Sequence, residues 1–294
     1  MIEKIFKTPR AAAMLSVVAN AALVAAKIAI GIFGGSVSVL SEGIHSGIDL
    51  IAALIAFFSV SLAAQPEDDK HPYGHGKIES VSGSIEALLI VVAGVLIVIE
   101  AVHKLKTGGE VSHVDLGLAV MLASVILNVL VSRVLFVVAK KNESQALEAD
   151  AQHHSTDIMT SVGVFLGLVI VKITKMHWLD AAVAFAVAAL IIWIGIKVLF
   201  NSFVDLIDQK LPEKEEKIIR TILDEHSYMF VEYHKMRTRK SGSVRYIDLH
   251  LVVAKDQNLE EAHNLCDHLE EDISKLFHNA NITIHIEPAN SPTT

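Results

Sequence analysis

Cysteine and charged residues are both scarce in this sequence. The single cysteine among 294 residues, Cys266, excludes an internal disulfide framework and a cysteine-rich zinc site. Charged residues make up 20% of the chain and hydrophobic residues 52%, a balance too apolar for an ordinary soluble domain. The net charge of −8 gives no electrostatic support to nucleic-acid binding. The sequence has no H-E-x-x-H phrase, the zinc motif of an intramembrane metalloprotease, and we expect a protein that is not an enzyme.

Six apolar stretches are each long enough to cross a bilayer as a helix, which takes about 20 mostly apolar residues. They cover residues 11–33, 36–63, 79–103, 114–138, 145–172 and 178–204. Six spans place both termini on the same side of the lipid membrane. Lys and Arg are more frequent in the loops on that side than in the loops on the other. We therefore predict a multi-pass protein of the inner (plasma) membrane with both termini in the cytoplasm.

The composition changes near residue 209, where charged residues become frequent and long apolar runs end. We predict a six-helix transmembrane domain over 1–208 and a cytoplasmic domain over 209–294. The second domain reads as a helix at 212–226, strands near 229–238 and 243–254, a helix near 258–278 and a strand at 282–286. This αββαβ order predicts a small α+β domain with its helices on one face of a short sheet.

Two His-x-x-x-Asp pairs lie inside the apolar stretches: His45 with Asp49, and His153 with Asp157. Residues four apart share one face of a helix, and ionisable groups at membrane depth are costly enough to suggest a function. Two such pairs together supply two imidazole nitrogens and two carboxylates, a donor set suited to zinc. The alternative is a set of polar contacts between helices. Asp150 could share the ligand face or sit at a water-filled mouth.

A second group of candidate ligands, Asp68, His71 and His75, falls in the loop between the second and third apolar stretches. These side chains could bind one metal ion. Gly and Pro in the same segment also fit a solvated polar loop, and spacing alone does not decide between the two.

A third group is spread over the C-terminal domain. His285 and Glu287 are two apart on a predicted strand and so share a face, while His250 lies on another strand. On spacing alone, surface histidines are the better interpretation of this group, which comprises His234, His250, His263, His285 and Glu287.

With these motifs taken together, the chain resembles the cation diffusion facilitators, a family of divalent-metal/proton antiporters, and most closely their bacterial ferrous-iron/zinc efflux branch. The resemblance covers nearly the whole chain and rests on the segments 41–49, 68–79, 149–157 and 234–242. It implies that the two membrane pairs form a transport site and that the loop group binds a second ion. It also implies a metallochaperone-like cytoplasmic domain with a two-ion site at a homodimer interface, built from His234, His250, His263, His285 and Glu287.

One position departs from the pattern of that branch, which often has Asp where this chain has His45. Exchanging a carboxylate for an imidazole favours zinc over harder ions such as manganese. Glu287 likewise stands where Asp is more usual.

The sequence therefore predicts a protein that exports zinc from the cytoplasm in exchange for protons, which compete with the metal for the histidines. Zinc in the C-terminal domain is expected to stabilise the homodimer and to regulate transport. Three alternatives stay open: efflux of another divalent ion (Fe, Cd, Co or Mn) by the same site, a membrane metal sensor that does not transport, and a passive channel.

Overall fold

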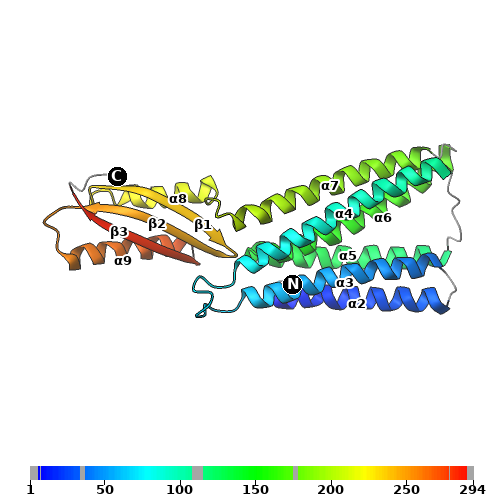
Figure 1. Ribbon diagram of the computed structural model, residues 1–294, viewed down its shortest axis with the longest axis horizontal. Helices are drawn as coiled ribbons and strands as arrows, with labels where there is room; N and C mark the ends of the chain where they lie inside the picture. The colour runs from blue at the N-terminus through cyan, green and yellow to red at the C-terminus, as the bar shows by residue number, and fades with distance from the viewer. Residues whose placement is uncertain are drawn as a thin grey trace. The chain divides into compact units, whose positions relative to one another are not determined.

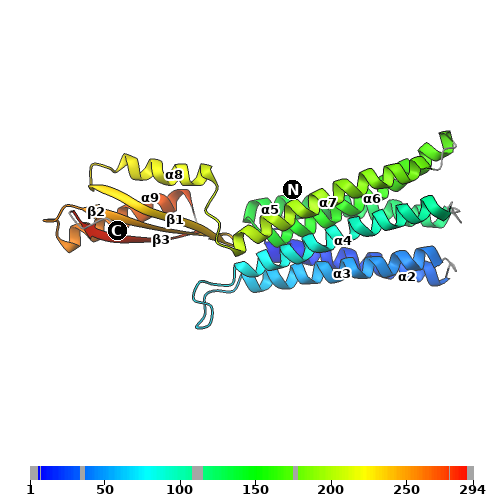
Figure 2. The ribbon, with the colours of Figure 1, turned by 45° about the horizontal axis from the view of Figure 1, so that its top comes forward.

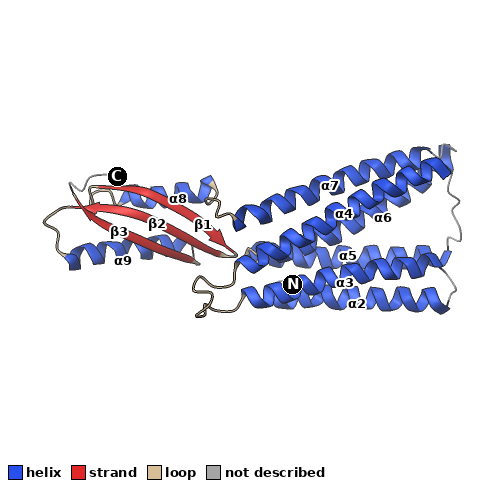
Figure 3. Cartoon of the chain, viewed as in Figure 1, coloured by secondary structure: helices blue, strands red, loops and turns tan. Residues whose placement is uncertain are grey.

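The computed structural model describes residues 6, 8–33, 37–107, 115–174, 178–277 and 279–289. The chain divides into two compact units, Met1–Phe203 and Val204–Thr294. The first unit is helical, and the strands all belong to the second, as Figure 3 shows for the described residues.

Six long helices correspond to the six predicted spans: α2 (Pro9–Phe33), α3 (Val37–Ala63), α4 (Lys77–Thr107), α5 (Asp115–Asn142), α6 (Gln145–Thr174) and α7 (Trp178–Leu206). Over the described residues, five of them are long and apolar enough to cross a membrane. Helix α6 carries three acidic residues and two histidines in its first half, and its residues 164–172 lie outside the part of the helix whose side chains the structure describes. The helical membrane domain expected from the sequence is confirmed.

Small residues allow these helices to pack closely. Helix α2 packs along α3 and α5, and α4 packs along α6 (Figures 1 and 2). A Cβ atom at Gly94 of α4 would lie only 2.6 Å from Cγ1 of Ile192 on α7, so glycine permits this approach. Large apolar side chains such as Trp193 and Phe200 remain exposed, as expected for helices whose outer faces contact lipid.

The second unit contains α8 (Glu213–Glu225), β1 (Glu232–Ser241), β2 (Val244–Val253), α9 (Leu259–Leu276) and β3 (Ala280–Pro288). The predicted αββαβ order is confirmed. The three strands lie in the order β1-β2-β3, with β1 antiparallel and β3 parallel to the central strand β2.

Strand alternation gives this sheet one apolar and one polar face. Ile247, Leu249 and Leu251 of β2 are buried in a core that also contains Leu223 of α8 and Leu269 of α9. Because both helices contribute to this core, both cover the same face of the sheet (Figures 1 and 2). The opposite face is polar, no described helix of this unit packs on it, and the predicted ligands of the strands lie on it.

Candidate metal centres

Three side chains from two helices meet inside the membrane unit: Asp49 of α3 with His153 and Asp157 of α6. Each offers one ligand atom, and these atoms lie within 4.8 Å of one another. We call this group the membrane cluster. His153 Nε2 is 3.2 Å from Asp49 Oδ1, although the two residues are 104 positions apart in the chain. His45 lies one helical turn before Asp49, but its side chain falls outside the described part of the structure.

The spacing of the membrane cluster fits a divalent ion. Zinc bonds of about 2.0–2.2 Å in tetrahedral geometry put neighbouring ligand atoms roughly 3.3 Å apart. The contact between His153 and Asp49 is close to that value, and both side chains are buried. The cluster therefore supplies one nitrogen and two carboxylates in a geometry that a metal ion can occupy.

The imidazole of His153 has little support on its other side. Its Nδ1 atom is buried and has no hydrogen-bond partner among the described residues. Histidines that hold a metal usually donate their second N–H to a neighbouring acceptor, which fixes the ring and strengthens binding. The absence of such an acceptor fits a site that must also release its ion.

Asp150 and His154 belong to a different buried network. His154 Nε2 lies 3.0 Å from Ser16 Oγ, and its Nδ1 lies 3.1 Å from Asn128 Oδ1. Asp150 is 3.8 Å from His154 and is 1% exposed. Asp150 is therefore buried and does not lie at an open, water-filled mouth, and its closest recorded ion pair is the one with His154.

The loop group also converges, and we call it the loop cluster. His71 Nδ1 lies 3.1 Å from Asp68 Oδ1, and His75 Nε2 lies 3.4 Å from Asp68 Oδ2. The backbone N–H groups of His71 and Lys70 donate to the Asp68 carboxylate, and these hydrogen bonds lower the pKa of Asp68. A carboxylate kept ionised beside two imidazoles is a suitable metal ligand, and the turn itself fixes its position.

On the open face of the C-terminal sheet, three histidines form a row across the strands. His234 of β1 pairs in register with His250 of β2, which pairs with His285 of β3. Glu287 lies beside the row, with Oε1 2.7 Å from His250 Nδ1 and Oε2 3.2 Å from His234 Nε2. The hydrogen bond with His250 lowers the pKa of Glu287. We call His234, His250 and Glu287 the open-face cluster.

His285 lies at the edge of this cluster, its ring centroid 4.7 Å from that of His250 and its Nε2 3.9 Å from Glu287 Oε1. At the other end of the row of histidines, a β-bulge in β1 keeps His234 in line with His250. His234 and Arg237 are three apart, yet they pair with His250 and Asp248, which are only two apart. Lys235, with φ of 52°, takes up the extra residue.

His263 does not join the open-face cluster within one chain. It lies on α9, which covers the opposite face of the sheet, and its side chain is 70% exposed. Its nearby carboxylate is Asp267, one helical turn away, at 3.6 Å. The sequence does not reveal this separation because it does not show which face of the sheet α9 covers.

A fourth group was not foreseen from the sequence: His226 at the end of α8 with His268 and Asp272 of α9. We call it the helix-side cluster. The sequence gives one indication of this group: His268 and Asp272 are four residues apart, the same spacing as in the two membrane pairs. Nothing in the sequence indicates that His226 meets them.

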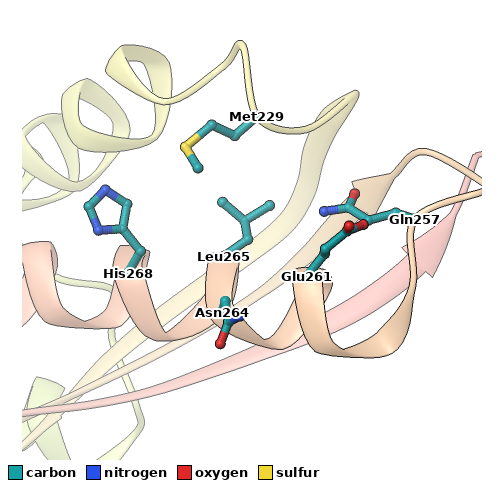
Figure 4. A pocket seen from close by; sticks show the side chains of 6 residues that line it. All are labelled: Met229, Gln257, Glu261, Asn264, Leu265 and His268. Atoms are coloured by element: carbon teal, nitrogen blue, oxygen red, sulfur yellow. The ribbon is translucent and has the colours of Figure 1, made fainter.

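An open pocket lies next to this fourth group. Figure 4 shows it between Met229 and α9, with His268 at one end. It is lined by Met229, Gln257, Glu261, Asn264, Leu265 and His268. Its remaining lining residues are apolar or neutral, apart from Glu261. The pocket contains none of the predicted transport ligands.

Comparison with known proteins agrees with this arrangement of a helical unit followed by a small α+β unit. The family model described as the cation efflux transmembrane domain matches residues 13–207. The chain belongs to the cation efflux family. A second family model, the cytoplasmic domain of cation efflux proteins, matches residues 211–289. The resemblance to the cation diffusion facilitators is confirmed.

Individual relatives cover nearly the whole chain. An uncharacterised transporter from Synechocystis is 34% identical over 95% of this chain and 90% of its own length. The cation-efflux pump FieF of Yersinia enterocolitica is 30% identical over 95% of this chain and 92% of its own length. Among solved structures, the Zn form of CzrB matches at 38% identity with a TM-score of 0.28, over 30% of this chain and 99% of the solved one. The family match and these relatives show that the chain is a polytopic membrane transporter.

Proposed function

We propose that this protein is a homodimeric zinc/proton antiporter that exports zinc from the cytoplasm across the inner membrane. The observation that carries the proposal is the convergence of Asp49, His153 and Asp157 from two helices into one buried cluster. Buried ionisable groups at membrane depth are characteristic of ion pathways. Zinc is the substrate here, held for a time and then released.

The donor set favours zinc over harder divalent ions. With His45 one helical turn before Asp49, the complete site has two imidazoles and two carboxylates. Imidazole suits zinc, whereas sites made of oxygen alone suit manganese or magnesium. Efflux of another ion, such as Fe, Cd, Co or Mn, is the alternative, and competition between zinc and each of these ions for uptake tests it.

Exchange with protons follows from the chemistry of the same ligands. A histidine binds metal only when neutral, and its ordinary pKa is near neutrality. A proton arriving from outside therefore competes with the ion for the imidazoles. Passive flow through a channel would not depend on the proton gradient.

The geometry of the C-terminal domain is consistent with the homodimer in this proposal. The open-face cluster has an uncovered polar surface, and the buried Nε2 atom of His234 has no hydrogen-bond partner among the described residues, although Glu287 lies 3.2 Å away. Zinc fits this site, because two imidazoles and a carboxylate converge there. His263 lies on the other side of the sheet, so it would reach such a site only from the partner subunit. Zinc held there would link the two chains.

Zinc flux in proteoliposomes with an imposed pH gradient tests the proposal. Replacing Asp49 or Asp157 by Asn removes one carboxylate ligand, and each change should abolish proton-driven zinc uptake. Glu148→Gln is the matched control, since Glu148 is an exposed acidic residue of α6 outside the cluster and should transport normally. Normal flux in both Asn variants would overturn the assignment. Zinc binding without any flux in the unaltered protein would indicate a metal sensor.

A further inference from the structure

The helix-side cluster has the geometry of a separate metal site. His226 Nε2 lies 3.1 Å from His268 Nε2 and 3.3 Å from Asp272 Oδ2. His268 Nε2 lies 3.8 Å from the same Asp272 oxygen. These three separations scatter around the roughly 3.3 Å expected between ligands of a tetrahedral zinc ion.

The hydrogen bond at the other nitrogen of His226 determines which of its atoms can bind metal. His226 Nδ1 lies 2.8 Å from the backbone oxygen of Ile222, one turn earlier in α8. A carbonyl oxygen only accepts, so Nδ1 carries the proton and donates it. In the neutral ring, Nε2 then presents its lone pair to His268 and Asp272. A backbone carbonyl behind a histidine is a common support for a metal ligand.

The surroundings also favour a cation. Helix α9 is acidic in the stretch that carries His268 and Asp272, with Asp267 and Glu270 among its residues. Lys275 donates to Asp272 Oδ1 at 2.9 Å and leaves Oδ2 directed at the two histidines. The side chains of His226, Asp272 and His268 are 14%, 24% and 46% exposed, so an ion can enter from solvent.

We propose that His226, His268 and Asp272 bind a zinc ion that fastens the end of α8 to α9. Water completes the coordination, since three protein ligands leave the fourth tetrahedral position open. The site lies on the helix-covered side of the sheet, whereas the open-face cluster lies on the other side. It binds cytoplasmic zinc within a single chain. The inference does not depend on transport, because metal binding by this domain is measured without any flux.

The first test counts zinc bound to the purified full-length protein by equilibrium dialysis against zinc and elemental analysis. His268→Gln should bind about one zinc ion fewer per chain than the unaltered protein. Glu271→Gln is the matched control: Glu271 also pairs with Lys275, at 3.2 Å, but belongs to no cluster. The control should keep the full zinc content. Equal zinc content in His268→Gln and the unaltered protein would overturn the proposal.

A second variant keeps the test decisive if His268→Gln folds poorly. In His268→Cys a thiolate replaces the imidazole, and thiolates also bind zinc and its spectroscopic substitute Co²⁺. The Co²⁺-loaded variant should gain a thiolate-to-cobalt charge-transfer band that the unaltered protein lacks, which separates it from any signal of Cys266. If this band is missing from the folded variant, His268 is not a metal ligand. A proton shared between His226 and His268 would then explain their short contact.

Discussion

The membrane cluster and the helix-side cluster both contain a His-x-x-x-Asp pair, but their histidines are supported differently. His153 Nδ1 has no hydrogen-bond partner among the described residues, whereas His226 Nδ1 donates to a backbone carbonyl. A supported ring is already oriented for metal, and an unsupported one is free to turn when the ion leaves. If both clusters bind zinc as proposed, the same donor types serve release in one place and retention in the other, and the contact behind the ligand makes the difference.

Removing the central ligand of the membrane cluster should have the largest effect. His153→Ala should lower zinc flux by at least about 100-fold, since even changes behind a ligand cost 10–100-fold in affinity. Zinc retained by the helix-side cluster should be unaffected. Flux in proteoliposomes and zinc content of the same preparation measure the two sites side by side. Loss of helix-side zinc in this variant would break the comparison by showing that the two sites depend on each other.

The pH dependence of zinc affinity at the membrane cluster should show whether His45 is one of its ligands. With two histidines in the site, zinc affinity should fall by up to about 100-fold per pH unit below the ordinary histidine pKa. His45→Asp should reduce that slope to about 10-fold and should relax selectivity towards cadmium or other ions. Zinc-dependent flux measured across a pH series, with competing metals, gives both quantities. An unchanged slope would mean that His45 is not a ligand.

A change at the β-bulge should act on the C-terminal domain and leave the membrane cluster intact. Lys235 has φ of 52°, which a β-branched residue adopts only with strain. Lys235→Val should destabilise the domain by about 1–2 kcal/mol, and Lys235→Gly should not. Thermal unfolding of the purified protein measures both variants. If the Val and Gly variants gave the same unfolding temperature, the positive φ at Lys235 would not be a source of strain for a β-branched residue.

The smallest expected effect is that of low pH on the stability of the C-terminal domain, through Glu287. Because the pKa of Glu287 is lowered from 4.5 in the folded protein, its contribution to stability is present above pH 4.5 and is lost as the pH falls below that value. Glu287→Gln should therefore be less stable than the unaltered protein near neutral pH and should lose less stability on acidification. Unfolding temperatures between pH 3 and pH 7 test this. Parallel curves for the two proteins would contradict the assigned role of the His250 contact.

Much of the architecture could be predicted from local patterns. Apolar stretches of sufficient length predicted the six helices, and alternation and turn residues predicted the αββαβ order, because both depend on residues close together in the chain. The pairs His153–Asp157 and His268–Asp272 are likewise local, since four residues make about one helical turn. Asp68, His71 and His75 could be grouped for the same reason.

The groupings across elements could not be predicted in this way. Register decides that His234, His250 and His285 form one row, and the bulge at Lys235 keeps that register. The face covered by α9 decides that His263 lies away from the row.

By itself, then, the sequence determined the membrane helices, the small α+β domain and the ligand pairs one helical turn apart, all through interactions between near neighbours. Only the tertiary structure decided which pairs meet. It placed Asp49 beside His153 across 104 residues and His226 beside His268 across 42. Packing of apolar faces between helices, and of helices on the sheet, brings these side chains together, and the positions of such contacts are not encoded in any short stretch of the chain.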